Sequence, residues 1–116
     1  MFKEHLRKLV EGVEGGRAAL LMDFDGIEVD HHVVGDLDIQ TLGIEFSQLM
    51  TNVKRQASIL EVGDLEEMMV RTRELLLLFR VVNNEYFLIV ACTPDGNFGK
   101  ARFLMRLAAP RFIEFF

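Results

Sequence analysis

Hydrophobic residues recur along the chain with two different periods, and these periods divide it into helices and strands. Three segments repeat apolar residues every three or four positions, as amphipathic helices do: residues 2–13, 38–60 and from 97 toward the C-terminal end. Five shorter segments are continuously apolar or alternate in steps of two, as strands do: residues 18–22, 27–33, 65–71, 75–82 and 86–92. The predicted order is helix-strand-strand-helix-strand-strand-strand-helix, in one domain over residues 1–116.

Residues at the borders of these segments favour the same division. Gly15-Gly16 ends the first helical pattern. A short acidic side chain, Asp36 or Asp38, is expected to cap the middle helix, because its oxygen accepts hydrogen bonds from free backbone amides. Pro110 is expected to bend or end the last helix, since proline has no backbone N–H. Phe115-Phe116 lies past this proline, and three placements stay open for it: in solvent, under the sheet or on a neighbour.

The polarity of the strands predicts their order in the sheet. Strand 27–33 alternates apolar and polar residues, and strand 65–71 contains Glu66 and Glu67, so both are expected at sheet edges. The other three strands are almost wholly apolar and are expected in the middle. A hairpin at Asp25-Gly26 and a meander of the last three strands then give the order 2-1-5-4-3, in a mixed or antiparallel sheet. The fold is α/β (α+β), with the middle helix on one face and the terminal helices on the other.

The middle helical pattern carries apolar residues on more than one side. Ile44 lies away from the main stripe, among Gln48, Thr51 and Arg55. Hydrophobic residues make up 50% of the chain before its 9 glycines are counted, whereas ordinary domains reach roughly 45–50% with glycine included. In a small domain this excess is expected to reach the surface, where apolar patches mark association sites. The main stripe, expected to face the sheet, consists of Ile39, Leu42, Phe46, Leu49, Met50, Val53, Ala57 and Leu60.

Charge and cysteine content narrow the classes of partner and compartment. The formal net charge is −5, and Lys and Arg are not clustered, which argues against nucleic acid as a partner. No apolar run approaches the roughly 20 residues of a membrane-spanning helix, so membrane insertion is not expected, and the charged N-terminal segment is unlike a secretory signal. With Cys92 as the single cysteine, an internal disulfide is excluded, which favours a reducing, cytoplasmic setting.

Asp23-Phe24-Asp25-Gly26 is the most enzyme-like motif in the sequence. It resembles the opening of the haloacid-dehalogenase motif, in which one aspartate attacks phosphorus and a second handles protons. A phosphohydrolase using Asp23 and Asp25 is therefore the enzymatic alternative. Phosphoryl transfer also needs a metal and a cation to hold the phosphate, and Ile27 stands where that family has a hydroxyl residue. We interpret the motif as a hairpin turn.

The other chemically suggestive residues have simpler interpretations. His31 and His32 are adjacent on a strand, so their side chains point to opposite faces and do not easily share a metal ion. Cys92 ends an apolar strand and is expected to be buried and inert. The segment 96–100 lacks the full glycine spacing and the Lys-Ser/Thr pair of a phosphate-binding loop. The sequence therefore predicts no catalytic residue, no cofactor and no metal site.

Four segments taken together resemble the Roadblock family, which contains dynein light chains and bacterial gliding-motility regulators. They run in family order and span nearly the whole chain. At residues 18–26, 75–82, 84–90 and 97–102 they read AALLMDFDG, LLLLFRVV, NEYFLIV and NFGKAR. The resemblance implies a profilin-like sandwich that forms homodimers or heterodimers. The sequence departs from the family at Arg73-Glu74, where the connection lacks a glycine.

The resemblance also implies where two copies meet. Family dimers join their middle helices and third strands into one continuous sheet. The middle helix and the edge strand are also the places where the hydrophobic pattern alone is unusual. The residues implied at the dimer interface are Ile44, Gln48 and Thr51 on the helix and Met68, Met69, Val70 and Arg71 on the strand.

The function implied by the resemblance is regulatory. Bacterial members of the family bind and regulate Ras-like small GTPases, typically without inserting a catalytic arginine. We therefore expect a non-enzymatic, homodimeric scaffold or regulator of such a GTPase, acting as a GTPase-activating protein or as an adaptor. The alternative is a structural subunit of a larger complex that has no GTPase partner.

Overall fold

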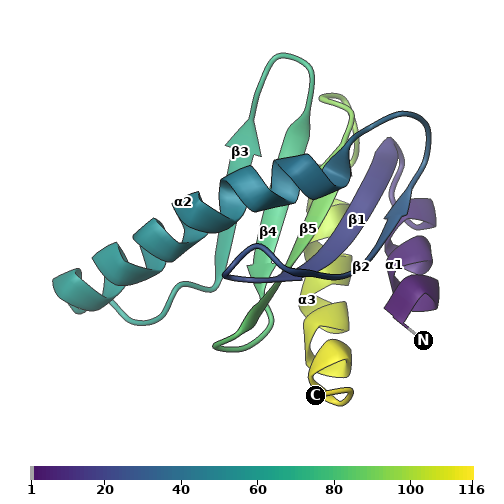
Figure 1. Cartoon of the computed structure of the whole chain (residues 1–116). Coiled ribbons are helices and arrows are strands. Elements are labelled where there is room, and N and C mark those ends of the chain that lie inside the picture. Colours follow the sequence, from purple (N-terminus) through teal and green to yellow (C-terminus); the bar gives the residue numbers. More distant parts are fainter. Residues whose placement is uncertain (1) are drawn as a thin grey trace.

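The computed structural model describes residues 2–116 and contains the predicted elements in the predicted order (Figure 1). The N-terminal half holds helix α1, a β-hairpin and helix α2, and the C-terminal half holds three strands and helix α3. The elements are α1 (Phe2–Glu11), β1 (Gly16–Asp23), β2 (Glu28–Val33), α2 (Ile39–Leu60), β3 (Glu67–Arg71), β4 (Leu76–Val81), β5 (Tyr86–Cys92) and α3 (Phe98–Ile113).

The strands form one sheet in the order β2-β1-β5-β4-β3, and every neighbouring pair is antiparallel. The predicted strand order is confirmed. Of the two sheet types left open by the sequence, mixed and antiparallel, the sheet is antiparallel. Helix α2 covers one face, while α1 and α3 cover the other (Figure 1). Adjacent residues of the central strands therefore enter different cores: Leu20 packs on the α2 side and Leu21 on the α1 and α3 side.

The hairpin between β1 and β2 has the predicted turn at Asp25-Gly26. Oδ1 of Asp23 accepts hydrogen bonds from the backbone N–H groups of Asp25 and Ile27, both at 2.9 Å. Gly26 has φ +89°, a left-handed conformation that favours glycine. The turn includes Ile27, which is exposed, so β2 begins one residue later than predicted, at Glu28.

Helix α2 approaches the sheet most closely at Gly43. A Cβ atom at this position would lie 2.3 Å from Cδ2 of Leu20 and 3.0 Å from Cε of Met22. Only a residue without a side chain allows this approach. At the start of the helix Asp38, not Asp36, is the N-cap, because its side chain accepts a hydrogen bond from the backbone N–H of Thr41.

The predicted apolar stripe of α2 is wrong at two positions. Leu49 and Leu60 are 42% and 67% exposed, whereas Gly43 and Ser47 are buried against the sheet. Small residues carry no hydrophobic signal in a sequence. The predicted buried face is therefore rotated about the helix axis relative to the face that packs on the sheet. Leu60 is exposed because the C-terminal end of α2 extends past the β3 edge of the sheet (Figure 1).

Helix α3 continues past Pro110 to Ile113, so of the two outcomes expected at this proline, a bend or an end of the helix, the end is not found. Proline removes a donor that would bond the carbonyl of Arg106, and Arg106 lies on the exposed side of the helix. Beyond the helix, the ring of Phe116 stacks on Tyr86 with 3.9 Å between centroids. The C-terminal phenylalanines contact the rings of Phe2 and Tyr86, yet Phe115 and Phe116 stay 36% and 48% exposed, so the observed placement lies between solvent and a position under the sheet.

Replacing Gly43 by alanine is expected to lower the free energy of unfolding by about 1–3 kcal/mol, because the new methyl group overpacks the Leu20 contact. Chemical denaturation measures the change. Gly99→Ala is the matched control, since its Cβ would meet nothing closer than Oδ1 of Asn97 at 3.7 Å. Equal stability of the two variants would contradict the close approach of α2 to the sheet.

Candidate protein-interaction surface

The three predicted interface residues on α2 come together in the structure. Ile44, Gln48 and Thr51 line a shallow depression beside the β1–β2 turn, together with Phe24 and Asp25. Ile44 is 47% exposed, so the prediction that it lies off the buried stripe is confirmed. The depression combines one apolar side chain with hydroxyl, amide and carboxylate groups, which suits contact with another protein surface.

A hydrogen bond and a cation–π contact hold this part of α2 against the turn. Oγ1 of Thr51 donates to the carbonyl of Phe24 at 3.3 Å. The Nζ atom of Lys54 lies 3.7 Å from the centroid of the Phe24 ring, a cation–π contact. The surface is thus built on a fixed helix and an anchored turn.

The four predicted interface residues on β3 lie on the edge strand of the sheet. Glu66 accepts a hydrogen bond from Val81, and Thr72 donates one to Leu75, both in the pairing with β4. Since inward and outward groups alternate along an antiparallel strand, Met68 and Val70 also bond to β4. The backbone N–H and C=O groups of Glu67, Met69 and Arg71 therefore point away from the sheet.

The end of α2 and the following loop add exposed apolar residues that the sequence pattern did not assign to the interface. Ile59, Leu60 and Val62 are 68%, 67% and 73% exposed. The length of the helix is the property of the sequence from which these exposed residues could have been predicted. A helix of 22 residues is about 33 Å long, whereas the outer strands of a five-stranded sheet lie only about 19 Å apart. A helix that starts over β1 and β2 and crosses this sheet must extend beyond β3 (Figure 1).

The residues considered for catalysis have structural roles. Asp23 holds the hairpin turn through its carboxylate, and Nδ1 of His31 lies 2.9 Å from Oε1 of Glu28. Cys92 is buried, and burial raises the pKa of its thiol. Within residues 2–116, no three His, Cys, Asp or Glu side chains are grouped to hold a metal ion. No helix in that range is long and apolar enough to cross a membrane.

Comparison with known proteins identifies the family. No protein-family model and no curated protein matches the chain significantly. Among solved structures, MglC from Myxococcus xanthus is 37% identical, over 93% of this chain and 92% of that one, with a TM-score of 0.67. A Roadblock/LC7 domain from Streptomyces avermitilis is 16% identical over 97% and 95% of the two chains, with a TM-score of 0.88. The gliding protein MglB from Thermus thermophilus is 18% identical over 92% and 82%, with a TM-score of 0.81.

The sheet order, the helices on both faces and these similarities define a Roadblock-type sandwich. The chain belongs to the Roadblock/LC7 family, as the sequence resemblance implied. The identity to MglC carries this conclusion, while the less similar structures confirm the fold.

Replacing Ile44 by glutamate is expected to weaken self-association at least tenfold while leaving the fold stable, because the side chain is half exposed and lies on the predicted interface. Sedimentation velocity across a dilution series measures the association. Ile113→Glu is the matched control, since Ile113 is similarly exposed, at 44%, but belongs to α3 on the opposite face. An unchanged association constant for Ile44→Glu would place the interface elsewhere.

Proposed function

We propose that this protein is a homodimeric, non-enzymatic regulator or scaffold for a Ras-like small GTPase. One observation carries the dimer: α2 extends past the β3 edge and presents exposed apolar residues there (Figure 1). A helix end without a sheet beneath it, next to a strand with outward N–H and C=O groups, is half of an interface.

A second copy supplies the other half. Antiparallel pairing of two β3 strands satisfies the outward backbone groups of Glu67, Met69 and Arg71 in each chain, and it continues the sheet beneath the end of α2. Such a pairing is isologous, because each chain contributes the same surface. Each large aliphatic side chain moved out of water contributes about 1.5–3 kcal/mol, and these gains offset the cost of association.

The regulatory role is supported by the family. The resemblance to gliding-motility members of the Roadblock family implies regulation of a Ras-like small GTPase, and this chain is similar to MglC and to the gliding protein MglB. The enzymatic alternative needs a free nucleophile at Asp23, whereas that carboxylate accepts two backbone hydrogen bonds in the turn. We place the protein in the cytoplasm, where such GTPases act, as a GTPase-activating protein or an adaptor.

Replacing Met69 by proline is expected to convert the dimer to a monomer without unfolding it. The N–H lost at position 69 points away from the sheet, and proline is tolerated at a strand edge. Light scattering coupled to size-exclusion chromatography gives the mass. Met69→Ala is the control, because it removes the side chain but keeps the backbone donor, and it is expected to remain dimeric. A dimeric Met69→Pro chain would rule out pairing through β3.

The GTPase partner is tested by binding. The immobilised protein is incubated with the Ras-like GTPases of its host, each loaded with GDP or with a GTP analogue. We expect one GTPase to be retained with a preference of at least tenfold for one nucleotide state. Co-purification from the host tests the alternative. If the protein is recovered in a stable complex without any GTPase, and no GTPase is retained in the binding assay, the protein is a structural subunit instead.

A further inference from the structure

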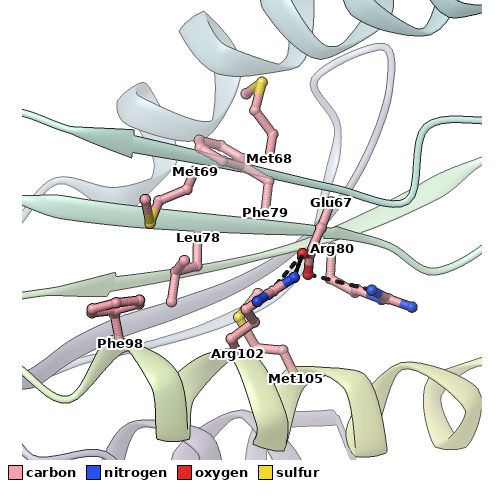
Figure 2. Close-up of a pocket in the computed structure, with 9 residues that line it drawn as sticks. All are labelled: Glu67, Met68, Met69, Leu78, Phe79, Arg80, Phe98, Arg102 and Met105. Atoms are coloured by element: carbon pink, nitrogen blue, oxygen red, sulfur yellow. Dashed lines mark hydrogen bonds and ion pairs between the residues drawn. The ribbon is translucent and has the colours of Figure 1, made fainter.

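A cleft lies between β3 and α3, on the face of the sheet opposite α2 (Figure 2). Its volume is about 290 Å³, and its walls are mainly apolar: Met69, Leu78, Phe98 and Met105. Met69 and Phe98 are 52% and 44% exposed. These side chains come from an edge strand and a helix start that are far apart in sequence, so the cleft was not visible in the sequence pattern.

Charged groups border the apolar walls. The carboxylate of Glu67 accepts a hydrogen bond from Nε of Arg102 at 2.7 Å and lies 3.5 Å from Nη1 of Arg80 (Figure 2). The hydrogen bond from Arg102 holds the pKa of Glu67 below its ordinary value. Two guanidinium groups thus face one carboxylate, which leaves the border positive. Arg102 uses Nε and Nη2 on Glu67, and its Nη1 has no partner among residues 2–116.

Beyond the cleft, the outer side of α3 is also basic and apolar. The helix has four basic residues and no acidic one, although the whole chain has a net charge of −5. Phe103 and Leu107 on this helix are 55% and 52% exposed. The basic residues beside them are Lys100, Arg102, Arg106 and Arg111.

We propose that the cleft binds an acidic amphipathic helix presented by a protein partner. One of its large apolar side chains enters between Phe98 and Met69, and its carboxylates pair with Arg102 and Arg106. Charge complementarity selects this occupant, because a surface that is both basic and apolar fits a segment that is both acidic and apolar. An anionic membrane fits less well, since the net charge of the chain is negative and the apolar groups line a recess.

This site borders the proposed dimer seam and shares Met69 with it, but it uses the side chain of that residue and not its backbone groups. Pairing through β3 uses backbone groups at the strand edge, whereas the cleft lies over the α3 face of the same strand. All of its walls belong to one chain. A monomeric result for the purified protein, or a failed GTPase binding assay, therefore leaves the cleft open to test.

The probe is a synthetic 15-residue helical peptide with leucines on one face and glutamates on the other, titrated into protein labelled with ¹³C at its methionine methyl groups. We expect the resonances of Met69 and Met105 to shift, while those of Met22 and Met50, buried on the α2 side, do not. The matched peptide has lysine in place of every glutamate and is expected to cause no shift. Equal shifts with both peptides, or none with the acidic one, would overturn the proposal.

Two charge-reversal variants test the residues assigned. Arg102→Glu is expected to weaken binding of the acidic peptide at least tenfold. The control is Lys8→Glu, which makes the same change of charge at an exposed position of α1 and is expected to change the affinity less than twofold. Equal effects of the two variants would reduce the interaction to net charge and overturn the site. Vesicles of phosphatidylcholine with one quarter phosphatidylserine are the membrane arm. Arg102-dependent sedimentation with these vesicles, without peptide binding, would assign the surface to lipid instead.

Discussion

The packing of α2 across the sheet is the constraint on which the rest of this structure depends. The helix is held close to β1 because Gly43 has no side chain to keep it away from Leu20, and the Asp38 cap fixes where it begins. From that start, a helix of this length cannot end over the sheet. The exposed apolar end of α2 is therefore a geometric consequence of a helix longer than the sheet is wide, and in our proposal a second copy of the chain covers it.

The two faces of the sheet carry different surfaces as a result. On the α2 face, the β1–β2 turn, the middle of the helix and its extended end form the surface that we assign to self-association. On the other face, α1 and α3 bury the sheet, and α3 turns basic and apolar residues outward beside the cleft. The edge strand β3 separates these surfaces, since Met68 faces α2 and Met69 lines the cleft wall from the other side (Figure 2).

Much of the fold follows from the sequence because strand polarity and turn chemistry are local. Glu66 and Glu67 mark an edge strand, and Asp25-Gly26 marks a hairpin, so the strand order could be deduced from the sequence alone. The buried face of α2 could not, because Gly43 and Ser47 give no hydrophobic signal. The cleft was missed for another reason: Met69 and Phe98 meet only after β3 has paired with β4 and α3 has packed on the sheet.

The central claim is that the free β3 edge and the extended end of α2 are two parts of one self-association surface. Sedimentation equilibrium of the unmodified protein over a wide concentration range tests it most directly. We expect a species of twice the chain mass of 13.3 kDa, which dissociates only on strong dilution. A protein that stays at the mass of a single chain at the highest concentration would contradict this claim.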